Sequence, residues 1–225
     1  MSGIWAVVPV KELNGAKQRL AGFFSPAERY RLAVTMLDEV LEAVAGARSL
    51  AGVALVTLDL HATAVAARRG WRVITEGARD GHTGSVEAGR RILAGEGVAG
   101  VLTLPGDIPA VTAAEIDAVV AAHRRVSDRF GPSFTIVPAH DEMGSNTVIV
   151  SPPLAVTLRF GDNSYYPHLD AARAAGIEPT IVRQPGIAMD IDHPADLAMF
   201  LGLALSQGTR TRAVLEEMGV QARMK

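Results

Sequence analysis

The chain has 225 residues, of which 48% are hydrophobic and only 5% aromatic. This apolar content is enough for one packed domain over residues 1–225 and disfavours a disordered chain. Its 22 basic and 24 acidic side chains give a net charge of -2, so it lacks the cationic field that non-specific nucleic-acid binding requires. Cysteine is absent, which excludes disulfides, thiolate metal sites and a cysteine nucleophile.

The start of the chain carries no secretory pattern. The apolar run Ile4 to Val8 comes before the first lysine, Lys11, so a basic start followed by an apolar core and a cleavage site is missing. No apolar run approaches the roughly 20 residues that cross a bilayer. We therefore expect a cytoplasmic protein without a membrane or nucleic-acid partner.

Short Val, Ile and Leu runs alternate with amphipathic Ala- and Leu-rich segments, a pattern typical of an α/β fold with helices on both faces of a sheet. Right-handed crossovers in such a sheet place ligands outside the carboxyl ends of the strands. The expected strands are 4–9, 53–58, 71–75, 100–104, 134–138, 147–151 and 179–183. A short polar loop separates 134–138 from 147–151, which indicates an antiparallel excursion. We expect a mixed, mostly parallel sheet.

Two helix starts are marked by capping boxes, in which a Ser or Thr and a Glu three residues later satisfy free backbone N–H groups. One is Ser25 to Glu28 and the other is Thr112 to Glu115. Apolar residues at helical spacing follow each box and should face the core. Further helices are expected at 61–69, 84–94, 165–175, 194–205 and 211–218. The tail 211–225 could pack on its own core or on another subunit, which leaves a homodimer open.

Two common nucleotide-binding motifs are missing. The chain has neither the Gly-x-x-x-x-Gly-Lys-Ser/Thr phosphate loop nor a strand-linked Gly-x-Gly-x-x-Gly, which disfavours a Walker ATPase and a standard dinucleotide dehydrogenase. The six histidines show no metal-binding spacing. No Gly-x-Ser-x-Gly supports a Ser-His-Asp triad.

The first strand runs into a cationic loop that contains Lys11, Gly15, Lys17 and Arg19. Nucleotides often bind after the first strand of an α/β sheet. An arginine fork, compact lysine charges and loop N–H groups could together surround a triphosphate. The alternative is a solvated surface loop, which most charged runs form.

Two acidic segments could supply metal ligands. Asp107 follows an apolar strand, and Mg²⁺ needs only one or two protein carboxylates beside phosphates and water, although a turn-forming Asp after Pro-Gly is equally common. Asp190 and Asp192 would share one side of an extended segment, so one could complete the metal shell while Asp192 caps the helix near Pro194. Asp190 is the better ligand by elimination, because capping alone would account for Asp192.

Polar loops could bind the rest of a nucleotide and a second substrate. Gly81 would let the backbone approach a base or ribose, and Thr83 and Ser85 offer hydroxyls beside a helix N-terminus, although an ordinary capped loop has the same composition. The loops 144–147 and 160–164 carry small polar donors. Together they suit a small anion such as a carboxylate or phosphate.

Six segments in this order form a recognisable set: Lys17-Gln18-Arg19-Leu20, Phe24 to Arg29, Leu104 to Pro109, Gly144-Ser145-Asn146-Thr147, Phe160 to Ser164 with His168, and Asp190-Ile191-Asp192. They resemble the phospho-hydroxyacid guanylyltransferases of coenzyme F-420 biosynthesis, over nearly the whole chain. The resemblance implies a fold like that of nucleotide-diphosphosugar transferases. It also implies an enzyme that joins GMP from GTP to the phosphate of a small phospho-acid and releases pyrophosphate.

The resemblance further implies roles for particular residues. By this resemblance Lys17 and Arg19 bind the GTP triphosphate, and Asp107 binds Mg²⁺ together with Asp190 or Asp192. The acid substrate is bound by Thr147, Gly161 and Ser164. In such a reaction the acceptor phosphate is already an anionic nucleophile, so alignment and charge neutralisation suffice and no general base is needed.

The segment 81–85 departs from the family, whose members usually carry a Gly-Leu-Asn-like loop followed by Ala, so base contacts there are less secure. The family uses 2-phospho-L-lactate, phosphoenolpyruvate or 3-phospho-D-glycerate as acceptor. The Ala- and Arg-rich composition is typical of a bacterial protein, which disfavours the archaeal 2-phospho-L-lactate version and slightly favours the other two acids. Two alternatives stay open. One is another nucleotidyltransferase of this fold acting on a sugar phosphate or pterin cofactor, and the other is a non-catalytic nucleotide-sensing module.

Overall fold

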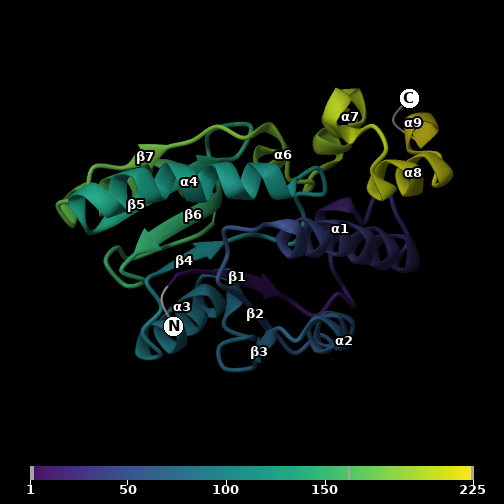
Figure 1. The fold of residues 1–225 in the computed structure, drawn as a ribbon. Helices are drawn as coiled ribbons and strands as arrows, with labels where there is room; N and C mark the ends of the chain where they lie inside the picture. Colours follow the sequence, from purple (N-terminus) through teal and green to yellow (C-terminus); the bar gives the residue numbers. More distant parts are fainter. Residues whose placement is uncertain (1–2, 162, 224–225) are drawn as a thin grey trace.

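The computed structural model describes residues 3–161 and 163–223, and its centre is a seven-stranded sheet. The strands are β1 (Ile4–Val10), β2 (Gly52–Thr57), β3 (Arg72–Ile74), β4 (Gly100–Thr103), β5 (Ser133–Pro138), β6 (Ser145–Ser151) and β7 (Thr180–Ile181). All seven expected strands are present, with ends shifted by at most two residues. Their order is β3-β2-β1-β4-β6-β5-β7, which Figure 1 shows from bottom to top.

The sheet is mixed because β6 runs antiparallel to both of its neighbours, β4 and β5, while every other pairing is parallel. The expected antiparallel excursion between 134 and 151 is therefore confirmed. The beginning of β6 lies at the same edge of the sheet as the carboxyl ends of β1 and β4, so three loops meet there.

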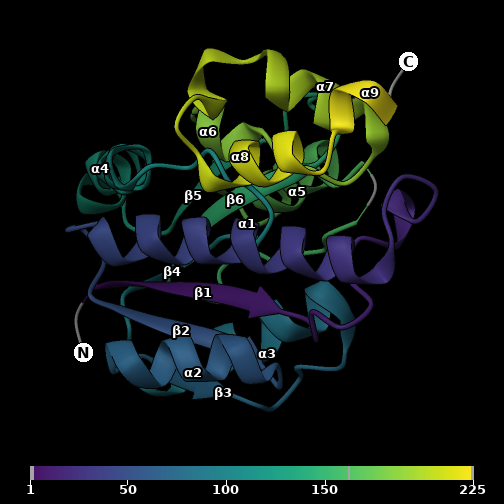
Figure 2. The ribbon, with the colours of Figure 1, turned by 90° about the vertical axis from the view of Figure 1, so that its right-hand side faces the viewer.

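Helices cover both faces of this sheet (Figures 1 and 2). On one face lie α1 (Pro26–Gly46), α2 (Leu60–Arg69) and α4 (Ala113–Phe130), whose apolar residues share a core with β1 and β2. On the other face lie α3 (Gly81–Gly95), packed on β1, β2 and β4, and α5 (Tyr165–Ala174), packed on β5 and β6. The fold class predicted from the alternating apolar runs is confirmed.

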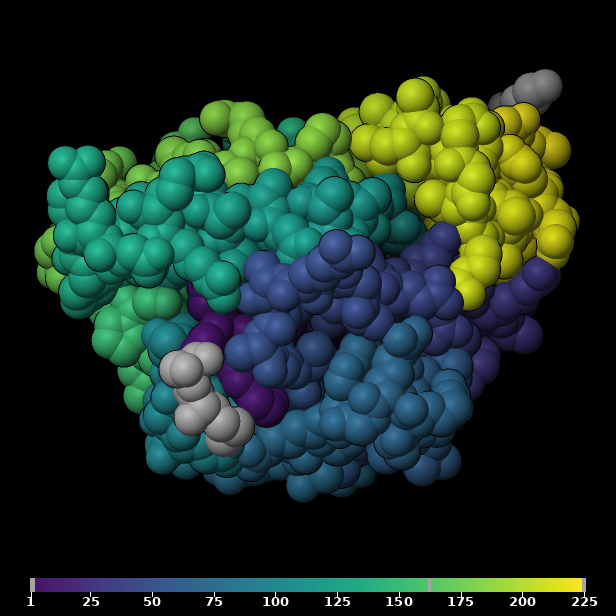
Figure 3. Space-filling view, in the orientation of Figure 1, coloured from purple at the N-terminus to yellow at the C-terminus, as the bar shows by residue number. Residues whose placement is uncertain are grey.

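Helix α1 is buried on two sides. Leu37 and Leu41 face the sheet, whereas Leu32 and Met36 pack against the C-terminal helices. Those helices are α7 (Pro194–Gly202), α8 (Arg210–Glu217) and α9 (Val220–Arg223). Figure 2 shows α1 between β1 and α8, and Figure 3 shows the yellow C-terminal segment seated at one end of the molecule. In the structure, residues 211–223 pack on the chain's own core.

Four short elements were not predicted: η1 (Gln18–Leu20), α6 (Pro185–Ala188), η2 (Ala204–Ser206) and α9. The expected helix 194–205 is divided, since Leu203 is extended between α7 and η2. Such single turns are too short to show a helical period in the sequence. Among the described residues, none of the helices has the length and apolar character to cross a membrane.

The capping box of α1 gives a test of how this helix is held. The Ser25 hydroxyl accepts the N–H of Glu28, and the Glu28 carboxylate accepts the N–H of Ser25 at 2.8 Å. We expect Ser25→Ala to lower the free energy of unfolding by about 1 kcal/mol because one N–H loses its partner. Thr35→Ala, at a partly exposed position in the middle of the same helix, should change it by less than about 0.5 kcal/mol. Urea unfolding of both variants measures this, and equal effects would contradict it.

Candidate active site

One buried ammonium joins the loops at the carboxyl edge of the sheet. The Nζ of Lys17, after β1, lies 2.7 Å from an Asp107 carboxylate oxygen, after β4, and 2.8 Å from an Asp192 carboxylate oxygen, before α7. The Lys17 side chain is only 9% exposed. Burial alone would lower the pKa of Lys17, but the two carboxylates outweigh it and raise the pKa. Lys17 is therefore charged and shared by two acids.

Asp192 receives a second cation. A guanidinium nitrogen of Arg19 lies 3.2 Å from its other carboxylate oxygen. Burial raises the pKa of Asp192, but the charges of Lys17 and Arg19 reverse this and hold the pKa below its ordinary value. The structure thus brings together four of the predicted residues, Lys17, Arg19, Asp107 and Asp192. Lys11, at the end of the same strand, is exposed.

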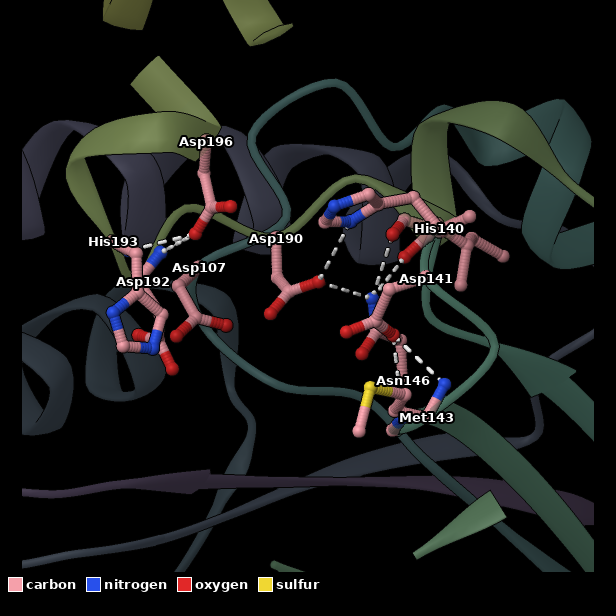
Figure 4. Close-up of polar contacts among 12 residues, drawn as sticks. Asp107, His140, Asp141, Met143, Asn146, Asp190, Asp192, His193 and Asp196 are labelled. Carbon is pink, nitrogen blue, oxygen red and sulfur yellow. Dashed lines mark hydrogen bonds and ion pairs between the residues drawn. The ribbon is translucent and has the colours of Figure 1, made fainter. Parts of the chain in front are cut away.

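Asp190 lies in a different electrostatic setting (Figure 4). Its carboxylate accepts a hydrogen bond from the Asn146 amide at 3.0 Å, and the His140 Nδ1 lies 3.8 Å away. Burial raises the pKa of Asp190, and the nearby charges of Asp107 and Asp192 raise it further, whereas the Asn146 hydrogen bond opposes them. Three carboxylates, those of Asp107, Asp190 and Asp192, therefore lie at one edge of the sheet, and folding makes ionisation of Asp190 less favourable.

Asp192 does not cap α7, contrary to one expectation from the sequence. The cap position is His193, and the Asp196 carboxylate accepts the backbone N–H groups of both Asp192 and His193, at 2.8 and 2.6 Å. Asp196 stands three residues into the helix, where an acid can reach back to these N–H groups. This leaves the Asp192 carboxylate free of capping and turned to Lys17 and Arg19.

The donor set suits a divalent cation bound together with phosphates. Within residues 3–161 and 163–223, no three histidine, cysteine or acidic side chains are grouped so that they could hold a metal ion by themselves. Asp107 and Asp192 nevertheless lie close enough together to share one positive charge, because both contact the Lys17 ammonium. A magnesium ion carried by a nucleotide needs only one or two such carboxylates.

The predicted nucleotide loop lies at the start of α3. Gly81 has a φ of +75°, which a glycine adopts without strain. The Thr83 hydroxyl accepts the backbone N–H of Phe160 at 3.0 Å, and the buried Ser85 hydroxyl donates to the Gly77 carbonyl oxygen at 2.9 Å. Both hydroxyls therefore hold loops together in this state of the protein, and their role as nucleotide contacts stays a prediction.

His82, next to these residues, packs its ring edge-on against Phe160 with 4.7 Å between centroids. Burial lowers the pKa of His82, the negative charge of Asp107 opposes this, and the positive charge of Lys11 adds to it. His82 is therefore a neutral ring close to the charged edge of the sheet. The loops that were predicted to bind nucleotide and acid thus contact each other through His82, Thr83 and Phe160.

The predicted acid-binding residues lie around the beginnings of β6 and α5. Ser164 is the N-cap residue of α5 and is buried. Gly161 has a φ of +136°, and a Cβ there would meet nothing within 4 Å. Thr147 is fully buried on β6, and its hydroxyl finds no hydrogen-bond partner among the described residues. A buried hydroxyl without a partner is costly unless a ligand or water satisfies it.

Two residues of this region, Asn146 and Ser145, were not assigned from the sequence. The pairing of β5 with β6 shifts between Val137 and Pro138, so Val137 pairs with Thr147 and Pro138 with Ser145. Asn146 is the extra residue of this bulge, and its amide also donates to Ile187 O at 2.9 Å. A bulge redirects side chains, so residue types alone could not show which donor of 144–147 faces which ligand.

Comparisons with known proteins agree with this fold and identify a family. The family model described as "Guanylyl transferase CofC like" matches residues 4–225. The phosphoenolpyruvate guanylyltransferase of Sphaerobacter thermophilus is 38% identical over 203 residues, which are 88% of this chain and 93% of that protein. The enzyme of the same name from Rubrobacter xylanophilus is 35% identical, with 87% and 92% covered.

Solved structures share the fold at low sequence identity. A protein of Desulfovibrio desulfuricans G20, described as a nucleotide-diphospho-sugar transferase, has a TM-score of 0.76 at 18% identity and covers 100% of this chain and 98% of its own. The 4-diphosphocytidyl-2C-methyl-D-erythritol synthase of Anaerococcus prevotii has a TM-score of 0.57 at 13% identity, with 96% of both chains covered. At such identities the likeness establishes the architecture alone.

The crowding of carboxylates predicts that Asp190 destabilises the free protein. An acid whose pKa is raised by folding costs stability where it is ionised in both states, and the cost vanishes below its unfolded pKa of about 3.9. Asp190→Asn keeps an oxygen for the Asn146 amide. Without divalent cations, we expect this variant to have a higher melting temperature than wild type at pH 7, with the difference disappearing towards pH 3.

The control for this prediction is Asp170→Asn, at a carboxylate on α5 whose side chain is 78% exposed. It should leave the melting temperature nearly unchanged at both pH values, since a weak surface ion pair contributes little. Differential scanning calorimetry compares the three proteins. If Asp190→Asn lowered the melting temperature at pH 7, the carboxylate would be stabilising and the electrostatic account of the site would be wrong.

Proposed function

The chain belongs to the CofC-like guanylyl transferase family, and we propose that it transfers GMP from GTP to phosphoenolpyruvate, with release of pyrophosphate, in coenzyme F-420 biosynthesis. The observation that carries the proposal is the Lys17 ammonium between Asp107 and Asp192, with Arg19 beside it. This cluster combines cations for phosphates with carboxylates for a metal. It stands at the sheet edge where α/β enzymes bind nucleotides.

The choice of phosphoenolpyruvate as acceptor rests on relatives. Five relatives that are 31–38% identical over at least 87% of this chain are all named phosphoenolpyruvate guanylyltransferases. From composition alone, 3-phospho-D-glycerate was as good a candidate. We therefore narrow the acceptor to phosphoenolpyruvate and keep the other two acids as comparisons in the test.

At the nucleotide end, Lys17 and Arg19 bind and neutralise the triphosphate. Phosphate oxygens offer the Lys17 ammonium new acceptors, so GTP can draw Lys17 away from Asp107 and Asp192. The two carboxylates would then hold a magnesium ion, which neutralises charge on the phosphates during the transfer. Arg19 stays within reach of Asp192 and presents a planar fork that fits phosphate oxygens.

At the acceptor end, Thr147, Gly161 and Ser164 bind the acid. The unpartnered Thr147 hydroxyl supports this assignment, because a ligand would satisfy a group that is otherwise buried without a hydrogen bond. Gly161 leaves open space where a side chain would stand. Ser164 lies at the N-terminus of α5, where the helix dipole favours an anion, although the Tyr165 N–H already donates to Met143 O at 2.9 Å and Pro167 has no N–H.

The reaction needs alignment more than acid-base chemistry. The acceptor phosphate is an anionic nucleophile that attacks the α-phosphorus of GTP, and the bond to the β-phosphate breaks as pyrophosphate leaves. The protein's task is to hold two anions together, which Lys17 and Arg19 make possible by cancelling their repulsion. The sequence accordingly has no cysteine and no Gly-x-Ser-x-Gly motif of an activated serine.

The runner-up is a nucleotidyltransferase of the same fold that acts on a sugar phosphate or pterin cofactor. The structural neighbours include enzymes with other acceptors, and they share the architecture. The guanylyl transferase family match and the names of the relatives favour the phospho-acid.

The direct test is product analysis. We expect mass spectrometry of reactions with GTP, Mg²⁺ and each of the three phospho-acids to show GMP joined to phosphoenolpyruvate, with pyrophosphate in equal amount. 3-Phospho-D-glycerate and 2-phospho-L-lactate should react more slowly. A reaction without added acid is the control. Transfer to a sugar phosphate alone, or none to any acid, would contradict the proposal.

The role of Asp107 has its own test. Asp107→Asn keeps the size of the side chain but removes the charge that faces Lys17, so we expect kcat to fall on the order of 100-fold while the fold is retained. Asp170→Asn, on the exposed side of α5, is the matched control and should keep the wild-type rate. A pyrophosphate-release assay measures both. Full activity of Asp107→Asn would remove Asp107 from the mechanism.

A further inference from the structure

A buried histidine lies beneath the acid-binding loop and contacts it through both ring nitrogens. His168, on α5, is 1% exposed. Its Nε2 accepts the backbone N–H of Arg159 at 3.0 Å, and its Nδ1 lies 3.0 Å from the Ser145 hydroxyl. The Ser164 hydroxyl in turn lies 3.3 Å from the Ser145 hydroxyl. These contacts connect the loop before α5, the start of α5 and the start of β6.

The position of the proton on His168 follows from these partners. A backbone N–H can only donate, so the Nε2 that faces Arg159 must carry no hydrogen. Burial, together with the positive charge of Arg90, lowers the pKa of His168 to about 4, so the ring is neutral at pH 7. A neutral ring then has its hydrogen on Nδ1 and donates it to Ser145.

Counting hydrogens shows what this tautomer does to the two serines. Ser145 accepts from His168 and from Ser164, which uses both lone pairs of its oxygen. The hydroxyl hydrogen of Ser145 is then left over within this group of three side chains. The opposite tautomer would force Ser145 to donate to the ring, and no hydrogen would remain for a ligand. The Arg159 contact therefore decides whether Ser145 can donate.

Ser145 is placed where that hydrogen can be used. It is partly exposed, whereas Ser164 and His168 are buried. It lies on the same strand as Thr147 and contacts Ser164, and both of these residues are assigned to the acid in the proposed function. A hydroxyl that donates to a carboxylate or phosphate forms a charge-assisted hydrogen bond.

The loop above His168 is fixed by the same residue. The Phe160 ring packs against the His168 ring, with 5.0 Å between centroids. The His82 ring also packs against Phe160, with 4.7 Å between centroids. Thr83 holds the Phe160 backbone. His168 thus sets both the direction of the Ser145 hydroxyl and the place of the loop that carries Gly161.

We propose, resting on the proposed function, that Ser145 is a further ligand of the acceptor's acid group and that His168 is its positioning residue. His168 acts by keeping its hydrogen on Nδ1, which makes Ser145 a donor to the anion. It does not touch the reacting atoms.

The first experiment reads the tautomer directly in the wild-type protein. We expect ¹⁵N NMR of protein labelled at the histidine rings to show His168 with a protonated Nδ1 and an unprotonated Nε2 at pH 7. His168→Phe identifies the signals by their loss. A protonated Nε2 would overturn the proposal, and this readout does not depend on activity.

The second experiment separates binding of the acid from binding of GTP. Ser145→Ala removes the donor, so we expect the KM for phosphoenolpyruvate to rise about 10- to 100-fold while the KM for GTP stays within about twofold. Ser145→Thr keeps the hydroxyl and is the matched control, which should restore most of the affinity. An unchanged KM for the acid in Ser145→Ala would overturn the inference but not the proposed function, since the enzyme would still turn over.

The third experiment tests whether His168 acts through Ser145. If it does, His168→Phe should raise the KM for the acid by a larger factor in wild type than in Ser145→Ala, because in the variant the hydrogen bond to Ser145 is already gone and only the effect on the Gly161 loop is left. Equal factors in the two backgrounds would show that His168 contributes only to the loop's structure and would overturn its positioning role. If wild type transferred GMP to none of the acids, the proposed function would fail, and this inference with it.

Discussion

The site depends on one ammonium that holds two carboxylates from distant parts of the chain. Lys17 is 90 residues from Asp107 and 175 from Asp192 in sequence, and its Nζ lies within 2.8 Å of both. Burial raises the pKa of both Asp190 and Asp192, but only Asp192 faces Lys17 and Arg19, which hold its pKa below the ordinary value, whereas two like charges raise the pKa of Asp190 further. Charge crowding of this kind costs stability, which is a common feature of sites arranged for charged ligands.

The sheet explains why these residues meet. Strands β1 and β4 are parallel neighbours, so the loops that follow them leave from one edge, and the antiparallel β6 begins at that same edge. The cationic loop, Asp107 and the serine-containing start of β6 are therefore brought together by topology alone. Parallel strands by themselves would have placed the beginning of β6 at the opposite edge, away from the cationic loop.

Much of this could be predicted from the sequence. Apolar runs gave the strands, capping boxes gave the starts of α1 and α4, and strand ends gave Asp107. The other features depend on contacts between segments. The capping role expected of Asp192 is taken by Asp196, and the register at Ser145 is set by a bulge in β6. Neither has a periodic pattern that a sequence can display.

The double burial of α1 bears on how the protein is made. The helix is synthesised early, yet much of the apolar cluster that covers Leu32 and Met36 comes from α7, α8 and α9, after residue 190. Until those helices have been synthesised and packed, the nascent chain exposes part of the apolar stripe of α1, a kind of surface that promotes aggregation or chaperone binding. The segment with Asp190 and Asp192 leads directly into these helices. The ion pair between Lys17 and Asp192 can therefore form only after most of the chain has been synthesised.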